Sequence, residues 1–306
     1  MKNHKAKKSL GQNFLKSVLA LNKIIEQGEI KNTDIILEIG PGKGVLTEKL
    51  LEKAERVIAV EKDRELYKFL KIKFEKEIKD RKLILLNEDI LEYNPLLTSP
   101  LSRGERKYKI IANIPYNITG AIFKKFLTEE NQPELMVLMV QHEVAKRIMG
   151  KNPTTLKLRG AKESILSISV KAYGEPKMIM KVPSRYFSPA PRVDSAIISI
   201  KNINRNKFTL SQPIPPSPQS SPEGRGGSQG ERVNTISEEK FWAIIHAGFA
   251  HKRKFLISNL KDICGRQGLP HIREIFKELK LSEKTRAEGL TLANWIYLIS
   301  KIDLAK

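Results

Sequence analysis

Short apolar runs alternate with amphipathic segments along the first two-thirds of the chain. The runs at 35–39, 57–60, 82–86, 108–112 and 135–140 are rich in β-branched and aliphatic side chains, which predicts buried strands. Helical periodicity fills the intervals at 44–53, 64–77, 118–127 and 142–149. This alternation favours a parallel, doubly wound sheet, so the predicted fold class is α/β.

The pattern changes after Pro183. Residues 195–200 form a β-branched run behind the proline-punctuated loop 184–191, and residues 177–182 fit the other strand of a hairpin. Residues 164–170 suit a strand by their β-branching and a helix by their length and setting, so both assignments stay open. From Ser237 onward the periodicity is helical, at 237–249, 252–264, 272–279 and 293–302, which predicts a small helical bundle.

The stretch 212–232 is dense in Pro, Gly, Ser and Gln and has almost no apolar side chains. It cannot recover the entropy lost on ordering, which predicts a flexible linker or surface insertion. The predicted organisation is therefore a sheet-containing domain at 1–205, a low-complexity linker or insertion at 206–236 and a helical domain at 237–306.

Charge separates this chain from an average globular protein. Its 306 residues include 55 Lys and Arg against 34 Asp and Glu, a formal net charge of +21. Such an excess favours a polyanionic partner, and nucleic acid is the leading one, although a general solubility effect is the simpler explanation. A candidate phosphate-contacting patch combines cations near both ends of the chain: Lys5, Lys7, Lys8, Lys252, Arg253 and Lys254. Each run taken alone is more typical of a solvated face.

Cysteine and histidine usage argues against internal disulfides and metals. Cys264 is the single cysteine and the five histidines are scattered, so we predict no disulfide and no metal site. The basic start has no signal-peptide core, and no apolar run is long enough to cross a bilayer. We therefore expect a cytoplasmic protein with no membrane partner, and a monomer.

A glycine-rich turn, Glu38-Ile39-Gly40-Pro41-Gly42-Lys43-Gly44, joins the first predicted strand to a helix. Glycines there let the backbone approach a ligand and leave amide donors at the helix start. A dinucleotide fingerprint would need glycine at Val45, and a P-loop would need Ser or Thr at Gly44. The spacing resembles S-adenosylmethionine sites instead, and predicts contacts from Gly40, Gly42 and Gly44.

Carboxylates follow the next two strands. Glu61 closes the strand at 57–60, where it could accept both ribose hydroxyls of an adenosine. Asp89 follows the strand at 82–86, within reach of an adenine amino group. Either residue alone could be a solvated acid or a cap. Together with the glycine turn they predict a ligand pocket, because ligands of open α/β sheets bind at the carboxyl ends of strands.

Asn113-Ile114-Pro115-Tyr116 ends the strand at 108–112, beside the same pocket. Pro115 holds Ile114 extended, which can aim the Ile114 carbonyl outward beside the Asn113 side-chain oxygen. Two acceptors facing the amine of adenine would favour a pyramidal, more nucleophilic nitrogen. Tyr116 would stack on the base, and Phe187 would form the opposite wall. The simpler interpretations are a proline turn with a half-buried tyrosine, and local packing of Phe187.

In this order the motifs resemble the ribosomal RNA adenine N6,N6-dimethyltransferase family, in particular the bacterial small-subunit (16S rRNA) dimethyladenosine transferases of the KsgA type. The resemblance runs over 9–15, 38–47, 60–61, 88–91, 112–117, 182–195 and 249–260. It implies a Rossmann-like class I methyltransferase domain, with a mostly parallel seven-stranded sheet that ends in a reversed hairpin, and a helical rRNA-binding domain. It also implies S-adenosylmethionine contacts from Asn13, Leu15, Gly40, Glu61, Asp89 and Asn113.

The resemblance implies a reaction: methyl transfer from S-adenosylmethionine to the N6 amines of two adjacent adenosines in 16S rRNA, giving N6,N6-dimethyladenosine during small-subunit maturation. We expect positioning and amine polarisation to dominate, without a strong general base. Large-subunit (23S) enzymes of the macrolide-resistance type share the Asn-Ile-Pro-Tyr block, but 10–15 and 249–254 look more like the small-subunit enzymes. A nicotinamide-dependent dehydrogenase, which Val45 disfavours, and a non-catalytic RNA- or DNA-binding protein also stay open.

Overall fold

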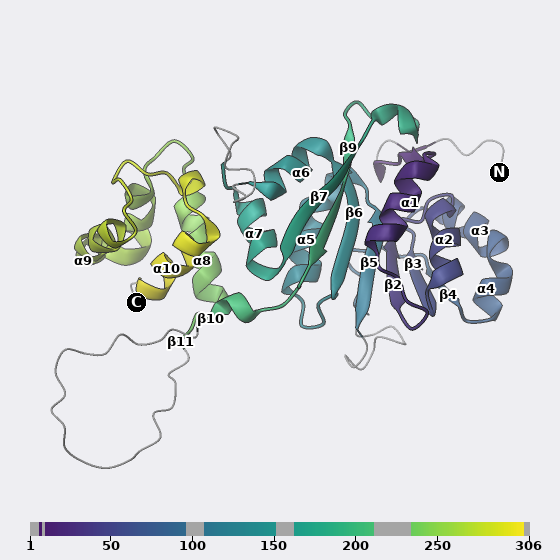
Figure 1. Cartoon of the computed structure of the whole chain (residues 1–306), viewed down its shortest axis with the longest axis horizontal. Helices are drawn as coiled ribbons and strands as arrows, with labels where there is room; N and C mark the ends of the chain where they lie inside the picture. Colours follow the sequence, from purple (N-terminus) through teal and green to yellow (C-terminus); the bar gives the residue numbers. More distant parts are fainter. Residues whose placement is uncertain (1–5, 8–9, 96–106, 151–161, 211–233, 303–306) are drawn as a thin grey trace, which may run out of the picture. The chain divides into compact units, whose positions relative to one another are not determined.

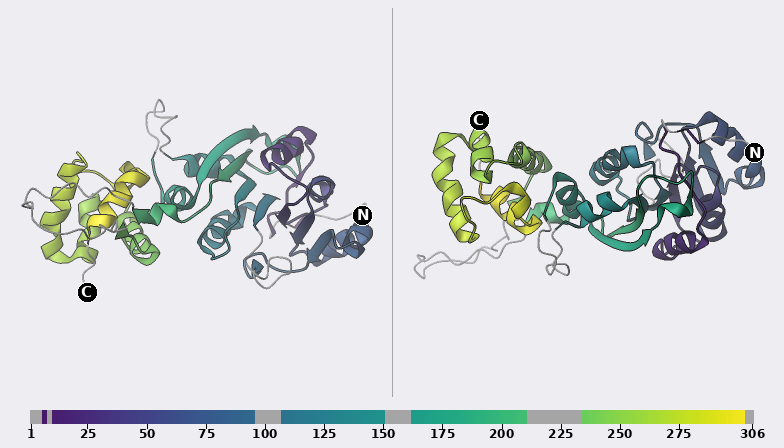
Figure 2. Two further views of the ribbon diagram at one scale, coloured as in Figure 1. Left: turned by 60° about the horizontal axis from the view of Figure 1, so that its bottom comes forward. Right: turned by 90° about the horizontal axis from the view of Figure 1, so that it is seen from above.

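The computed structural model describes residues 6–7, 10–95, 107–150, 162–210 and 234–302. The chain forms two compact units, one made of 1–157 and 166–204 and the other of 158–165 and 205–306 (Figures 1 and 2). The three-part division at 1–205, 206–236 and 237–306 stays a prediction, because most of the proposed linker lies outside the described residues.

Unit 1 is built on a seven-stranded sheet in the order β4-β3-β2-β5-β6-β9-β7 (Figure 1). The first five strands in this order run parallel, and β9 is antiparallel to both β6 and β7. This confirms the predicted Rossmann-like sheet with a reversed terminal hairpin. The strands are β2 (Ile35–Ile39), β3 (Arg56–Val60), β4 (Leu83–Leu86), β5 (Tyr108–Asn113), β6 (Leu135–Gln141), β7 (Glu175–Val182) and β9 (Ser195–Lys201).

Two short strands pair outside this sheet. β1 (Phe14–Leu15) runs antiparallel to β8 (Phe187–Ser188), so that Leu15 lies opposite Phe187. This pairing attaches the start of the described chain to the loop before β9. Neither strand was predicted, because a two-residue strand leaves no alternation in the sequence.

Helices connect the strands of unit 1 (Figure 2). They are α1 (Val18–Gln27), α2 (Val45–Lys53), α3 (Arg64–Lys73), α4 (Glu75–Lys79), α5 (Thr119–Thr128), α6 (His142–Met149) and α7 (Ile165–Tyr173). The helix predicted at 64–77 is divided because Phe74 leaves helical geometry, at φ −112° and ψ 31°, and buries its ring. The open assignment at 164–170 is settled as a helix, α7.

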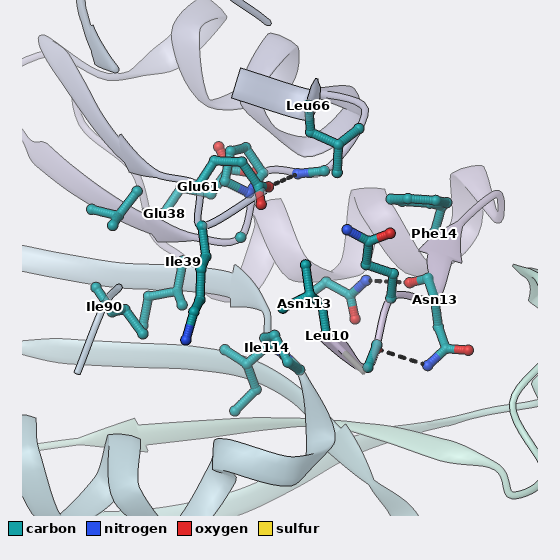
Figure 3. A pocket seen from close by; sticks show the side chains of 18 of the residues that line it. Leu10, Asn13, Phe14, Glu38, Ile39, Glu61, Leu66, Ile90, Asn113 and Ile114 are labelled. Carbon is teal, nitrogen blue, oxygen red and sulfur yellow. Dashed lines mark hydrogen bonds between the residues drawn. The ribbon is translucent and has the colours of Figure 1, made fainter. Parts of the chain in front are cut away.

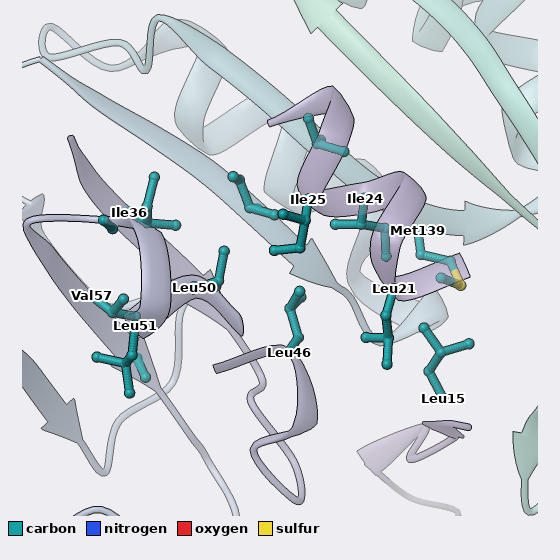
Figure 4. Close-up of a cluster of buried hydrophobic side chains, with 14 of the residues drawn as sticks. Leu15, Leu21, Ile24, Ile25, Ile36, Leu46, Leu50, Leu51, Val57 and Met139 are labelled. Carbon is teal, nitrogen blue, oxygen red and sulfur yellow. The ribbon is translucent and has the colours of Figure 1, made fainter. Parts of the chain in front are cut away.

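Helix α1 was not predicted, although its sequence explains it. The Ser17 side chain accepts a hydrogen bond from the Ala20 amide and caps the first turn. The buried positions of α1 fall on one face, with Leu21, Ile24 and Ile25 among them. That face packs into the core layer shown in Figure 4, beside Leu46, Leu50, Leu51, Ile36, Val57 and Met139. The layer therefore fixes the start of α2, immediately after the glycine-rich turn.

Unit 2 contains α8 (Glu238–Phe249), α9 (Leu256–Glu278) and α10 (Leu292–Lys301), preceded by a small antiparallel pair, β10 (Thr209–Leu210) and β11 (Asn234–Thr235). The prediction of two separate helices, at 252–264 and 272–279, is wrong. A single helix, α9, spans this region and contains Pro270. Leu256 and Leu260 before the proline and Ile272 after it are all buried, so apolar contacts hold the helix on both sides of Pro270.

The basic run 251–254 was expected to begin a helix, and this too is wrong. The Lys254 amide donates to the His251 carbonyl to close a turn, and Phe255 is extended at φ −68° and ψ 149°. The helix begins only at Leu256. None of the helices in the described ranges combines the length and apolar character that a membrane crossing needs.

Candidate active site

A pocket lies at the carboxyl ends of β2, β3, β4 and β5 (Figure 3). The chain proceeds from β2 to β3 on one side and returns to β5 on the other, and a crevice forms where the strand order reverses. The pocket is open to solvent, and residues that follow all four strands line it. It brings together ten predicted site residues: Asn13, Leu15, Gly40, Gly42, Glu61, Asp89, Asn113, Ile114, Pro115 and Tyr116.

The glycine-rich turn forms one wall of the pocket. Gly40 and Gly42 have φ values of +65° and +59°, in the left-handed region that side chains other than glycine rarely adopt. A Cβ atom on Gly42 would also lie 3.0 Å from the Phe14 ring. Backbone freedom and close approach therefore both require glycine at Gly42.

Glu61 anchors this turn from the end of β3. Its side chain is buried, and its two carboxylate oxygens accept hydrogen bonds from backbone amides: Oε2 from Gly42 at 3.0 Å and Oε1 from Asp63 at 2.8 Å. Each carboxylate oxygen has capacity for a further hydrogen bond. Glu61 thus has a fixed orientation and can still accept from hydroxyl groups of a ligand.

Glu38 is a site residue to which the sequence analysis assigned no role. It lines the pocket beside Glu61 in Figure 3, is 1% exposed, and its Oε2 atom has no hydrogen-bond partner within the described part of the chain. Burial raises the pKa of Glu38 to about 8. The nearby Thr47 hydroxyl lowers this pKa somewhat, although it forms no well-aligned hydrogen bond, and the Glu61 carboxylate raises the pKa further. A lone carboxylate in the apolar run Ile-Ile-Leu-Glu-Ile was the signal that could have identified it.

Asp89 carries a charge at the end of the pocket nearest β4. Its Oδ2 atom lies 2.6 Å from Lys62 Nζ, and its Oδ1 atom accepts a hydrogen bond from the Leu91 amide at 3.0 Å. The hydrogen bond from Lys62 holds the pKa of Asp89 below its ordinary value. Lys62 and Asp89 both line the pocket, so an ion pair borders the place where the sequence predicted an adenine amino contact.

The amide of Asn113 is oriented by the N-terminal segment. Its Nδ2 atom donates to the Asn13 carbonyl at 3.1 Å, and the Asn13 side chain in turn donates to the Gly11 carbonyl at 3.1 Å (Figure 3). Because the nitrogen of the Asn113 amide is engaged, its oxygen is the atom offered as an acceptor. An amide oxygen held in this way can accept a hydrogen bond from an amine.

Tyr116 begins a short 3-10 helix, η3 (Tyr116–Ile118), directly after Pro115. Its hydroxyl lies 2.5 Å from Ser195 Oγ at the start of β9, and burial raises the pKa of Tyr116. The phenol is therefore neutral, and the ring is anchored at its far end while one part of it borders the pocket.

Two predicted site residues do not line the pocket. Phe187 pairs with Leu15 across β1 and β8, is 2% exposed, and belongs to the hydrophobic core. Gly44 ends the turn with φ +74°, where a Cβ atom would lie 2.6 Å from the Phe74 ring. The left-handed φ and the packing against Phe74 each require glycine at this position.

The predicted basic patch is only partly described. Lys5 and Lys8 lie outside the described residues. Lys7 pairs with Asp63 at 3.0 Å and with Glu65 at 3.4 Å, while Gln12 donates to Asp63 at 2.8 Å. These bonds tie the N-terminal segment to the start of α3. Lys252, Arg253 and Lys254 are exposed in unit 2. No group of His, Cys, Asp and Glu in the described ranges is arranged to hold a metal ion.

Sequence comparison connects the chain to known proteins. Residues 3–210 match the family described as "Ribosomal RNA adenine dimethylase". The chain is 34% identical over 296 residues to "Ribosomal RNA small subunit methyltransferase A" of Fusobacterium nucleatum, covering 96% of this chain and 97% of the relative. A protein of the same description from Dehalococcoides mccartyi is 36% identical over 291 residues, covering 95% and 86%.

Solved structures with the same fold include 23S rRNA methyltransferase ErmE, with a TM-score of 0.66, 21% identity, and coverage of 95% of this chain and 99% of that one. A dimethyladenosine transferase from Plasmodium falciparum gives a TM-score of 0.66 at 23% identity, covering 93% and 95%. These likenesses support the fold alone. The family match and the full-length relatives together show that this chain belongs to the ribosomal RNA adenine dimethylase family.

Proposed function

We propose that this chain transfers methyl groups from S-adenosylmethionine to the N6 amines of two adjacent adenosines in 16S rRNA, two methyl groups to each base. The carrying observation is the oriented Asn113 oxygen in the same pocket as the glycine turn and Glu61. An acceptor for an amine and a site for a nucleoside cofactor are the two parts that such a transfer needs.

The residues at the ends of β2, β3 and β4 fit S-adenosylmethionine. When bound, the cofactor supplies a methyl group on a positively charged sulfur. Glu61 would accept the ribose hydroxyls, Asp89 would face the adenine amino group, and Gly40 and Gly42 let the backbone come close to the ligand. Asn13 and Leu15 would close the pocket from the N-terminal side.

The residues after β5 fit the target base. The Asn113 oxygen, with the Ile114 carbonyl, would accept hydrogen bonds from the amine and favour the geometry in which its lone pair can attack. Tyr116 would stack on the base, a contact worth about 1–3 kcal/mol. A base acted on in this way leaves its stack in the RNA. Since Phe187 is buried beside Leu15, its contribution would be to support the wall and not to touch the base.

The choice of 16S rRNA rests on the relatives, which are named as small-subunit methyltransferases. The net charge of +21 suits an RNA partner. A 23S rRNA methyltransferase is the second candidate, and a non-catalytic RNA-binding protein on the same fold is the third. Action in the cytoplasm as a monomer remains our prediction.

The test is incubation of the full-length protein with under-methylated small subunits and labelled S-adenosylmethionine, followed by mapping of the labelled bases. We expect dimethylated adenosines in 16S rRNA. Asn113→Ala should abolish transfer while calorimetry still detects cofactor binding. The control is Asn32→Ala, which changes an exposed asparagine before β2 and should keep full activity. Label in 23S rRNA, or normal turnover by Asn113→Ala, would contradict the proposal.

A further inference from the structure

Gln141 is a polar residue at the carboxyl edge of the sheet whose side chain is not engaged by the fold. It ends β6 and stands at the N-cap position of α6, yet it makes no capping hydrogen bond. It is half-buried, and its side-chain amide has no hydrogen-bond partner within the described part of the chain. The N–H donors and the oxygen of this amide are therefore available to a ligand.

The register of β6 gives the direction of the Gln141 side chain. Side chains alternate between the two faces of a strand, so Val137, Met139 and Gln141 share one face of β6. Val137 and Met139 belong to the core layer that also contains Leu21 and Ile24 of α1 (Figure 4). Gln141 consequently leaves the sheet on the α1 side, one side-chain step beyond Met139.

The neighbouring strands place two more polar residues on this face. Asn113 ends β5, which pairs with β6 on one side, and Ser195 begins β9 on the other side, directly opposite Gln141. Ile111 and Ile197, which lie two residues from Asn113 and Ser195, belong to the same core layer, so both polar side chains share its face. Gln141 therefore lies between the strands that carry Asn113 and Ser195.

The Tyr116 ring spans the same part of the edge. It follows β5, and its hydroxyl lies 2.5 Å from Ser195 Oγ. A base stacked on this ring with its amine at Asn113 would extend toward Ser195 and Gln141. Gln141 does not line the pocket of Figure 3, which holds the residues proposed for the cofactor. The base, and not the cofactor, is thus the ligand that Gln141 would reach.

We propose that Gln141 donates a hydrogen bond from its side-chain amide to a ring nitrogen next to the amine of the target adenine, N1 or N7, and holds the base for the second methyl transfer. The inference rests on the proposed function, because it takes adenine dimethylation as the reaction. The amide of glutamine is a group that pairs well with adenine. The Asn113 amide nitrogen already donates to the Asn13 carbonyl, so the donor to the ring must come from another residue.

The two transfers to one base differ in what holds the base. In each transfer the amine nitrogen bonds to the methyl carbon, the carbon–sulfur bond breaks and leaves its electron pair on sulfur, and the amine loses one proton to solvent. The unmodified amine has two N–H groups for the Asn113 and Ile114 oxygens, whereas the monomethylated amine has one. A hydrogen bond to the ring does not depend on the amine hydrogens. Loss of the Gln141 donor should therefore slow the second transfer more than the first.

The experiment incubates full-length wild type and Gln141→Leu with under-methylated small subunits and S-adenosylmethionine, and measures monomethyl- and dimethyladenosine in the digested rRNA over time. Gln141→Leu should raise the ratio of monomethyl- to dimethyladenosine about three- to ten-fold, the effect of one lost hydrogen bond. Gln141→Glu should act likewise, because a carboxylate does not donate. Gln132→Leu is the matched control, since it changes another half-buried glutamine, ahead of β6, and it should keep the wild-type ratio.

Adenine analogues identify the partner atom. When the target positions of the 16S rRNA carry 1-deazaadenosine or 7-deazaadenosine, one of the two should raise the wild-type ratio to that of Gln141→Leu. The variant should show no further rise on that analogue, because the same hydrogen bond is already lost. An unchanged ratio in Gln141→Leu, an equal slowing of both transfers, or an unchanged wild-type ratio on both analogues would overturn the inference.

The outcome is separable from that of the proposed function. If the wild type makes dimethyladenosine in 16S rRNA and Gln141→Leu makes it in the same ratio, only this inference fails. If the wild type transfers no methyl group to the small subunit, the proposed function fails and the inference fails with it.

Discussion

The hydroxyl groups of Tyr116 and Ser195 lie 2.5 Å apart and join the aromatic residue of the pocket to the first residue of β9. Ser195 is fully buried, and β9 is the strand that reverses the direction of the sheet. The antiparallel end of the sheet thus holds in place a ring that follows the parallel strand β5.

Ser195→Ala should lower kcat/KM for methyl transfer about two- to ten-fold, because loss of one hydrogen bond frees the Tyr116 ring. Cofactor affinity should not change. Tyr116→Phe should give a similar loss, and the double variant should lose little more, since both changes remove one interaction.

Ser199→Ala is the matched control for Ser195→Ala. Ser199 lies on the same strand and is 1% exposed, but its hydroxyl has no partner within the described ranges. Activity reduced equally by both alanine variants would show that the Tyr116 contact is not responsible.

Glu61→Gln should weaken S-adenosylmethionine binding about ten-fold or more. The amide that replaces one carboxylate oxygen cannot accept from both the Gly42 and Asp63 amides, so one buried donor loses its partner and the glycine turn loosens. Calorimetry measures the effect. Glu52→Gln, an exposed change on α2, should bind as the wild type does, and unchanged affinity in Glu61→Gln would argue against the anchoring role.

Glu38 should make stability fall as pH rises between about 4.5 and about 8. Its pKa is about 8 in the folded protein and near 4.5 when unfolded, so the folded state binds more protons within this window. The contribution of Glu38 to the free energy of unfolding is greatest below the pKa of the unfolded state. It is lost as pH rises through the pKa of the folded state, by up to about 1.4 kcal/mol per pH unit. Urea unfolding of wild type and Glu38→Gln at pH 5.5 and 8 measures it: the variant should lose less stability over this range. Parallel pH profiles would contradict the assignment.

Gly44→Ala should destabilise the protein by about 2–5 kcal/mol, through left-handed strain and overlap with Phe74. Gly120→Ala offers the contrast, since Gly120 lies in α5 with no atom within 4 Å of the added Cβ, and should be neutral or stabilising by about 0.5–1 kcal/mol. Urea unfolding measures both changes. A loss of cofactor affinity without a loss of stability in Gly44→Ala would restore the ligand-contact interpretation.

The strand series could be predicted because each buried strand is an apolar run of its own, and the α/β alternation then fixes where the strands end. Parallel strands present their carboxyl ends at one edge, so Gly40, Glu61, Asp89 and Asn113 could be assigned to one pocket before any coordinates. These predictions depended only on where each strand ends, and the apolar runs of the sequence locate the strand ends directly.

Side-chain direction was harder to predict. Phe187 is turned into the core by its pairing with Leu15, a contact between segments far apart in the chain. The stretches 252–264 and 272–279 were predicted as separate helices, but α9 continues through Pro270, because burial on both sides of the proline outweighs the lost hydrogen bond. Glu38 was overlooked because its pKa depends on the depth of burial and on Glu61, neither of which is visible in a single strand pattern.

The Asn113 side chain donates to the Asn13 carbonyl, and the Gln12 side chain donates to Asp63. These two hydrogen bonds make the N-terminal segment part of the pocket. An affinity tag fused at the N-terminus would extend the segment whose residues make these two contacts, so it is expected to disturb the orientation of the Asn113 amide. Protein intended for kinetic measurements should carry its affinity tag at the C-terminus, because weak turnover by an N-terminally tagged sample would reflect the tag and not the enzyme.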